Sequence, residues 1–449
     1  MQLVSTYSVK IKSYNHVLKE TVTAYRYAVT FFIGVALEEW DVLEPITSSN
    51  YRQLAMEQLT VRTKKRPLPK YPFEDANQMF VKFPSYLRRS AINEALGKVS
   101  SYKSNFANWQ NADKKMRGRE PAEPKAGYVY PAMYRDNCFV RTGTYTARLK
   151  VYIRNTWDWL DVELKKSDVD YIQRHCTTCK ECAPTLQKRG KQWFLDFPFE
   201  EKVSLSSVCV EKQTIVAVDL GIHNACTCSI MRADGTVLGR RFLSLPREND
   251  CLNHAVNRIK KAQQHGARKT PRLWAKAKGI SDDIAVKTAA FIMDTAKEYH
   301  ADVIVFEHLD LTGKKKGSKK QRLHHWKARY VQSIVEGRAH RMGKRISRVN
   351  AWRTSKLAYD GSGLVERGTY LQNGVEKYNY SICTFPTGKQ YHCDLNATYN
   401  IGARYFIREH IKSLTERKRL GILANVPECA KRSTCTLSTL IKLYAVLVA

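Results

Sequence analysis

The chain has 449 residues, of which 43 % are hydrophobic and 10 % aromatic, which is enough apolar material for two or three folded domains. Lys and Arg number 75 against 42 Asp and Glu, giving a formal net charge of +33. A surplus of this size opposes compaction by self-repulsion, and its usual reason is a polyanionic partner such as nucleic acid. A generally basic surface and attraction to anionic lipid are the alternatives that composition leaves open.

No segment of the sequence is expected to cross a membrane. The apolar runs 28–37 and 437–449 are shorter than the roughly 20 residues that a spanning helix needs. The N-terminus lacks the charged and apolar regions of a secretory signal. We therefore expect a cytoplasmic protein, associated with the nucleoid when bound to DNA, whose 12 cysteines are thiols or metal ligands rather than disulfides.

The first 212 residues predict a β domain that is interrupted by helices. Residues 1–14 alternate between apolar and polar side chains, which predicts an opening strand. Apolar residues then recur at helical spacing, most clearly from Phe83 to Trp109. After a basic, proline-containing stretch, short alternating segments predict the strands of a small β-barrel or sandwich, which the opening strand is expected to join.

The remaining residues predict an α/β domain. Thr214–Asp219 and Asp302–Glu307 each predict a buried strand that ends on a carboxylate. Asp234-Gly235 predicts a hairpin between strands at 225–231 and 237–242. Ser281, followed by two aspartates, predicts the N-cap of a helix.

Three acids in this half form a candidate metal site. Asp219 and Glu307 are expected at the carboxyl edge of one sheet, and Asp394 at the start of a helix. Close carboxylates repel one another unless a cation lies between them, and hard oxygen ligands suit Mg²⁺ or Mn²⁺. Such ions support phosphodiester hydrolysis. The alternative is that these acids are ordinary strand-end residues facing solvent.

The segments around these acids resemble a known family. Val218-Asp219-Leu220-Gly221, Val305-Phe306-Glu307-His308-Leu309 and Asp394-Leu395-Asn396-Ala397 resemble the three RuvC signatures of the TnpB transposon nucleases and the compact type V CRISPR effectors. The resemblance is close over the C-terminal half and weaker over the N-terminal half. It implies that Asp219, Glu307 and Asp394 are the catalytic Mg²⁺ ligands of an RNA-guided DNA endonuclease.

The sequence departs from that family just before the third acid. Relatives carry two Cys-x-x-Cys pairs there, whereas this chain has Ala358-Tyr359-Asp360-Gly361 and Cys383-Thr384-Phe385-Pro386. Zinc needs four ligands in a closed site, so we expect no zinc in the segment from about 354 to 393. Turns and aromatic side chains are expected to hold it instead, namely Gly361, Gly363, Gly374, Tyr378, Tyr380 and Phe385.

A second group of cysteines lies in the predicted β domain. His175, Cys176, Cys179 and Cys182 have spacing that allows three thiolates and one imidazole to bind a structural zinc ion. Leu186 stands where a ferredoxin-type iron–sulfur run would place a further cysteine. Free reduced thiols on a surface loop are the alternative.

A strongly basic stretch follows the second acid. Residues 312–348 contain thirteen Lys or Arg and one acid, Glu336. Beside a catalytic carboxylate such a stretch is expected to contact nucleic-acid phosphates, although a solvated surface is the simpler reading of any charge run. The candidate contacts are Lys314, Lys315, Lys316, Lys319, Lys320, Arg338, Arg341 and Arg345.

Together these features predict a multidomain α+β protein. Residues 1–14 and 121–212 would form a wedge-like small β-barrel, with a helical recognition lobe at 15–120 inserted in it, and 213–449 an RNase H-like RuvC nuclease domain. The expected partners are guide RNA and double-stranded DNA, and the oligomeric state stays open. A guided DNA-binding protein that does not cut, and an unguided structure-selective nuclease, are the alternative functions.

Overall fold

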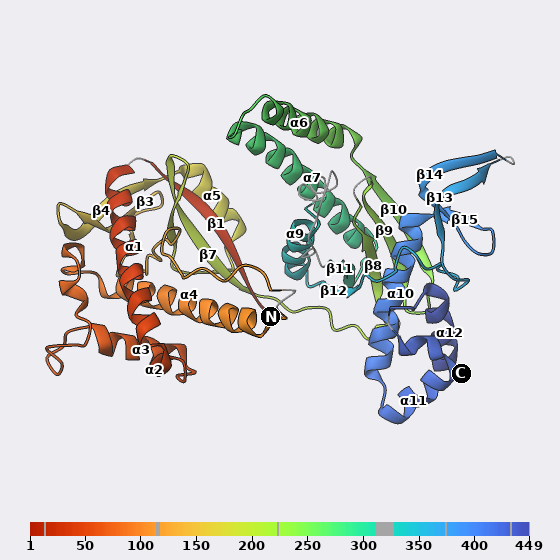
Figure 1. Cartoon of the computed structure of the whole chain (residues 1–449), viewed down its shortest axis with the longest axis horizontal. Helices are drawn as coiled ribbons and strands as arrows, with labels where there is room; N and C mark the ends of the chain where they lie inside the picture. The colour runs from red at the N-terminus through yellow and green to blue at the C-terminus, as the bar shows by residue number, and fades with distance from the viewer. Residues whose placement is uncertain are drawn as a thin grey trace. The chain divides into compact units, whose positions relative to one another are not determined.

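The computed structural model describes residues 1–12, 15–113, 117–221, 224–309, 327–372, 375–431 and 433–448 (Figure 1). These residues form two compact units, Gln2–Lys202 and Val203–Ala449, with Met1 joining the second. No helix among the described residues has both the length and the apolar character needed to cross a bilayer.

The first unit is built on a seven-stranded antiparallel sheet with the order β2-β3-β4-β1-β7-β5, in which β6 also pairs with β7. Its strands are β1 (Gln2–Lys12), β2 (Phe139–Arg141), β3 (Thr146–Ile153), β4 (Thr156–Leu164), β5 (Lys180–Glu181), β6 (Thr185–Arg189) and β7 (Gln192–Lys202). The opening strand β1 pairs with β7 from Gln2 to Ile11 and reaches β4 at its end.

The sheet is open, so the predicted small β-barrel is wrong. A barrel needs a continuous hydrogen-bonded ladder between its first and last strands. Here β2 has three residues and pairs only with β3, and among the described residues a single bridge between Ala132 and Thr185 approaches closure.

The helices between β1 and β2 share one hydrophobic core with the sheet. They are α1 (Asn15–Glu38), α2 (Trp40–Leu43), α3 (Ser49–Thr60) and α4 (Ser85–Asn111), and α5 (Lys166–His175) follows β4. Val9 of the sheet, Phe32 of α1 and Leu149 of β3 belong to the same buried cluster. The division of this unit into a wedge-like domain and a helical lobe therefore stays a prediction.

The second unit contains a five-stranded sheet with the order β10-β9-β8-β11-β12. Its strands are β8 (Thr214–Asp219), β9 (Asn224–Arg232), β10 (Val237–Ser244), β11 (Val303–His308) and β12 (Arg345–Asn350). The first three in the chain pair antiparallel, whereas β8, β11 and β12 run parallel. Helices connect the parallel strands, as parallel pairing requires.

Both faces of this sheet are buried because each is covered by helices. Ile215 and Ala217 of β8 lie in the core with α10 (Cys393–Ser413) and α12 (Leu437–Val448), whereas Val216 and Val218 face α7 (Pro271–Glu298) and α9 (Ala328–Arg341) (Figure 1). The near-continuous apolar sequence of β8 follows from this double coverage.

Helix α7 begins ten residues before the predicted N-cap. Its first residue is Pro271, and Ser281 lies inside it with an exposed fraction of 2 %. The extra turns pack against α6 (Pro246–Gln264), where Ile259 and Ala277 share a small apolar cluster. Tertiary packing therefore extends the helix toward its N-terminus, beyond the capping signal at Ser281.

Between β12 and α10 lies a three-stranded antiparallel sheet of β13 (Glu366–Gln372), β14 (Val375–Thr384) and β15 (Gln390–His392), and α11 (Glu416–Asn425) follows α10. Phe385 is buried and Gly361 and Gly363 have positive φ, in keeping with the supports expected there. Tyr378 and Tyr380 are exposed and so do not form its core, and Gly374 lies outside the described residues.

Gly402 allows the packing of helix α10 against the five-stranded sheet to be tested. An added Cβ would collide with the buried sulfur of Met231 and lie 3.3 Å from the Cβ of Ala217. Gly402→Ala should lower the free energy of unfolding by about 1–3 kcal/mol, through overpacking against the sheet.

Gly337 of α9 is the matched control, because its added Cβ meets nothing within 4 Å. Gly337→Ala should stabilise by up to about 1 kcal/mol through helix propensity. Denaturant titration of both variants measures the difference, and equal effects would contradict the packing described.

Candidate functional site

Two carboxylates leave adjacent parallel strands at the same level. Asp219 is the last residue of β8, and Glu307 follows Phe306, whose Cα partner in β8 is Val218. The apolar residues before each acid fix both strands in the core, so their carboxyl ends meet at one sheet edge. Both residues are intermediate between buried and exposed.

The third carboxylate belongs to the first turn of α10. The His392 ring nitrogen Nδ1 accepts a hydrogen bond of 3.2 Å from the amide of Asp394, which caps the helix. Asn224 donates to Asp394 Oδ2 at 3.0 Å, and an Arg367 guanidinium nitrogen lies 3.8 Å from Oδ1. The side chain is thus fixed by β9 on one side and β13 on the other.

The other two acids act electrostatically on Asp219. Burial raises the pKa of Asp219 well above its usual range, and the negative charges of Glu307 and Asp394 raise it further. Burial also raises the pKa of Glu307, against a hydrogen bond from Thr354 that lowers it. Because the ionised carboxylates are costly in this site, a bound cation that neutralises their charge would be favoured.

A buried network orients Glu307. The Thr354 hydroxyl donates to Glu307 Oε1, and the Gln332 amide donates to the Glu307 carbonyl at 3.0 Å. Asn400 of α10 in turn donates to the carbonyls of Thr354 and Leu357, at 2.9 and 2.8 Å. The segment after β12 is therefore fixed from the same helix that carries Asp394.

Sequence reasoning missed these supporting residues. Thr354, Arg367 and Asn224 contact the carboxylates from positions 47, 27 and 170 residues away along the chain. No local pattern marks them, because each contact depends on how distant elements pack. Asn400 lies three residues after the third motif, and the sequence did not assign it a role.

The donor set of this site fits a divalent cation. Three carboxylates supply hard oxygen ligands, and Asp219 feels the charge of the other two. Within the ranges described above, however, no three or more His, Cys, Asp or Glu side chains are close enough together to form a ligand group. The assignment of the three acids as metal ligands therefore stays a prediction.

The cysteines of the first unit occupy different environments. Cys176 is buried in the hydrophobic core, whereas Cys179 and Cys182 are partly exposed. Cys182 approaches the Lys180 carbonyl at 3.9 Å, and His175 lies against the ring of Tyr171. The described residues bring no three of these side chains together as ligands, and zinc here stays a prediction.

Two cysteines of the insertion lie near the third acid. Cys383 of β14 and Cys393, the first residue of α10, are both buried and share a small core with Ala358 and Phe385. The Cys383 thiol lowers the pKa of Cys393 to about 7 through a hydrogen bond, and the Arg367 guanidinium contributes in the same direction.

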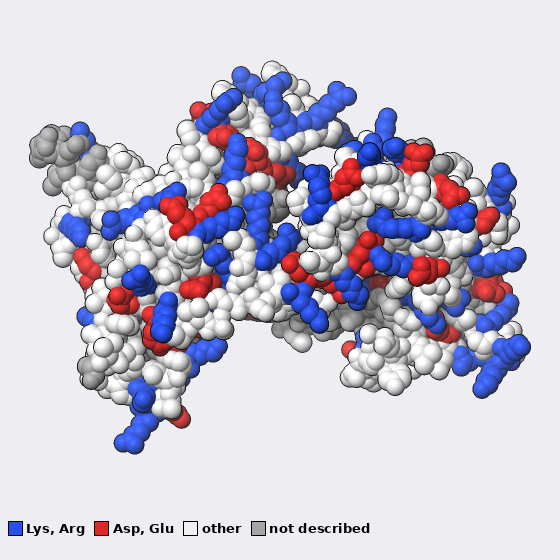
Figure 2. Space-filling view, turned by 180° about the vertical axis from the view of Figure 1, so that it is seen from behind, with Lys and Arg blue, Asp and Glu red and all other residues white. Residues whose placement is uncertain are grey.

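Only some of the basic residues of 312–348 lie in the described part of the chain. Lys314, Lys315, Lys316, Lys319 and Lys320 lie outside the described residues. Arg338 and Arg341 are exposed on α9, and Arg345 is partly exposed at the start of β12. Figure 2 shows Lys and Arg spread over the face it draws, with Asp and Glu between them. Their contacts with nucleic acid stay a prediction.

Metal analysis tests the cysteine assignments. The purified protein should contain either no zinc or one zinc, because the sequence spacing of His175, Cys176, Cys179 and Cys182 would supply at most one zinc site. Any zinc should be lost from a Cys176→Ser/Cys179→Ser variant. The control is Cys383→Ser, and zinc that persists in the double variant but is lost from this control would contradict the interpretation.

Comparison with known proteins finds a matching family model and two related proteins. The Aq_aa04 family model matches residues 5–153. The uncharacterized protein aq_aa04 of Aquifex aeolicus (strain VF5) is 38 % identical over 86 residues, 19 % of this chain and 46 % of that protein. The match thus spans about half the length of that relative.

A second relative from the same organism, the TnpB-like protein aq_aa05, is 24 % identical over 238 residues, 48 % of this chain and 74 % of that protein. Among solved structures, a Cas12f1–sgRNA–target DNA complex has a TM-score of 0.49 at 13 % identity, covering 86 % of this chain and 81 % of that one. Alicyclobacillus acidoterrestris C2c1 with single-guide RNA has a TM-score of 0.43 at 11 % identity, covering 86 % and 66 %. The similarity to a TnpB-like protein agrees with the resemblance carried by the three motifs.

Proposed function

We propose that the protein is an RNA-guided DNA endonuclease whose RuvC-type site hydrolyses phosphodiester bonds with Mg²⁺ or Mn²⁺. One observation carries the proposal. Asp219 and Glu307 lie at the same level on adjacent parallel strands, and Asp219 feels the charges of both Glu307 and Asp394.

The sheet order supports an RNase H-like assignment for the second unit. Three antiparallel strands precede two that run parallel to the first, and helices cover both faces. The acids lie on the first strand, on the next parallel strand, and on a helix that packs across both. The relation to a TnpB-like protein supports the same assignment.

Some residues of the site would bind the metal ion, and others would orient the carboxylates that bind it. Bound Mg²⁺ would supply activation of water and stabilisation of the leaving 3′ oxygen. Asp219, Glu307 and Asp394 would hold it, while Thr354 and Asn224 keep two of these carboxylates in fixed orientations. Arg367 places a positive charge beside Asp394, where it can also face a scissile phosphate.

The guide would supply sequence specificity. A net charge of +33 exceeds what one small nuclease site needs, and the first unit contains none of the three acids. A protein that reads an A-form heteroduplex through its backbone needs many cations and no base code of its own. We therefore assign guide-RNA binding to the first unit together with the basic stretch 312–348.

Removing any one carboxylate should stop cleavage. Asp219→Ala, Glu307→Ala and Asp394→Ala should each lower the single-turnover cleavage rate by ~10³-fold or more, with nucleic-acid affinity largely retained. EDTA should stop the wild type, and added Mg²⁺ or Mn²⁺ should restore it. Asp294→Ala is the control because this exposed acid of α7 lies outside the site. Normal cutting by any of the three variants would contradict the assignment.

The purified protein should carry a tightly bound RNA. After that RNA has been sequenced and stripped, reconstitution with a chosen guide should direct cleavage to matched duplexes beside a short flanking motif. Mismatched duplexes in a library with randomised flanks are the control. Equal cutting of all duplexes by RNA-free protein would indicate an unguided nuclease, and matched binding without cutting would indicate a guided DNA-binding protein.

A further inference from the structure

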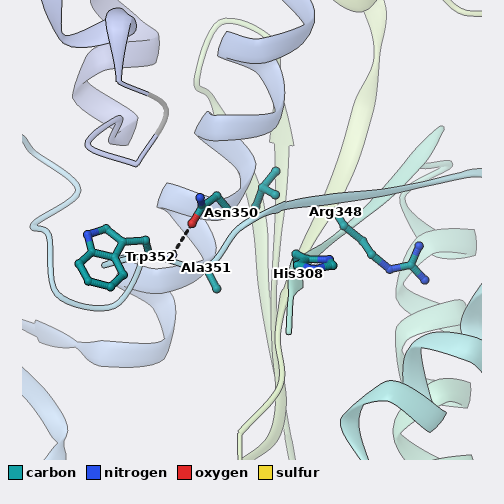
Figure 3. Close-up of a pocket in the computed structure, with 6 residues that line it drawn as sticks. His308, Arg348, Asn350, Ala351 and Trp352 are labelled. Atoms are coloured by element: carbon teal, nitrogen blue, oxygen red, sulfur yellow. Dashed lines mark hydrogen bonds between the residues drawn. The ribbon is translucent and has the colours of Figure 1, made fainter. Parts of the chain in front are cut away.

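An open surface hollow of about 550 Å³ lies at the carboxyl ends of β11 and β12, and it is lined by His308, the residue after Glu307. Its lining residues are His308, Arg348, Val349, Asn350, Ala351 and Trp352. Figure 3 shows Trp352 at one end of this set and Arg348 with His308 at the other. The volume is in the range of cavities that accept a nucleotide-sized ligand.

The backbone that carries Trp352 is held firmly. Arg404 of α10, only 4 % exposed, donates to the carbonyls of Asn350 and Trp352 at 2.7 and 2.8 Å. Asn350 Oδ1 accepts the Trp352 amide at 2.7 Å, and the next residue, Arg353, has a φ of +59°. A buried arginine therefore fixes a turn whose conformation is uncommon for a side-chain-bearing residue.

The indole itself nevertheless faces solvent, with an exposed fraction of 63 %. A single exposed tryptophan is unremarkable in most places. Here its backbone is fixed two residues before Thr354, whose hydroxyl donates to Glu307. A large flat apolar side chain on a fixed backbone loses less entropy when it binds a second ring than one on a mobile segment.

The surrounding charge suits a nucleotide. The Arg353 guanidinium carbon lies 5.7 Å from the centre of the Trp352 ring, and its charge remains available to a phosphate. Arg348 lies across the cavity, although it is also paired with Glu336 at 2.7 Å. An aromatic face with cations around it is how proteins bind single-stranded nucleic acid, since each unpaired base offers a π-face.

We propose that Trp352 is a base-stacking platform that accepts one unpaired nucleobase of the DNA strand to be cut, close to the scissile phosphate. The proposal rests on the proposed function and specifies its substrate as single-stranded DNA. Bases within a duplex already stack on their neighbours, so their faces are not available to an indole. Duplex DNA must therefore be opened before this site can bind it.

Stacking can be measured without cleavage. The protein with its guide RNA is mixed in EDTA with DNA oligonucleotides that carry 2-aminopurine at successive positions of the strand to be cut. Fluorescence should be quenched at one position, where the base stacks on the indole. Trp352→Ala should abolish this quenching and Trp352→Phe should retain most of it. Unchanged quenching in Trp352→Ala, or quenching only of 2-aminopurine placed in the guide RNA, would overturn the proposal.

Cleavage gives an independent test through a double-mutant cycle. An abasic nucleotide at the quenched position should slow single-turnover cleavage about 5- to 150-fold at subsaturating enzyme, as Trp352→Ala does. The two changes together should be no worse than either alone. Additive effects would show that Trp352 acts elsewhere and would overturn the proposal.

Tyr330→Ala is the matched control, because this half-exposed ring of α9 also carries a cation over its face, Lys327, at 5.8 Å. It should show no coupling to the abasic position. Equal unfolding midpoints of the variants exclude misfolding as the cause. Quenching that depends on Trp352 in a protein that never cuts would support the platform and contradict only the proposed endonuclease activity.

Discussion

The cost of ionising Asp219 beside two other carboxylates is the constraint on which the candidate site depends. Burial raises the pKa of Asp219, the charges of Glu307 and Asp394 raise it further, and burial also raises the pKa of Glu307. Arg367 and the hydrogen-bond donors Thr354 and Asn224 offset part of it. The rest of the fold must hold the carboxylates close together against this cost. A bound cation would remove most of the remaining free-energy cost of ionising them.

Helix α10 supplies much of that support. It carries Asp394 in its first turn, fixes the segment after β12 through Asn400, and holds the Trp352 turn through Arg404. Its close approach to β8 and β9 at Gly402 sets its distance from the sheet that bears the other two acids. Helix α10 thus connects Asp394, the segment that orients Glu307 and the proposed stacking platform. A reaction that needs fixed geometry benefits from such a connection.

Much of the second unit could be predicted from the sequence because its signals are local. The apolar runs before Asp219 and Glu307 and the Asp234-Gly235 turn mark strands and a hairpin directly. The open sheet and the early start of α7 could not be predicted, because strand closure and helix length depend on tertiary packing. The same holds for Arg404, whose partner Asn350 lies 54 residues away.

The proposed function requires that Asp219, Glu307 and Asp394 together bind a divalent cation. Anomalous diffraction from Mn²⁺-soaked crystals tests this most directly. We expect Mn²⁺ bonded to carboxylate oxygens of all three residues at about 2.0–2.2 Å, distances typical of small hard cations. Mn²⁺ bound elsewhere, or bound with only one of these carboxylates, would contradict it.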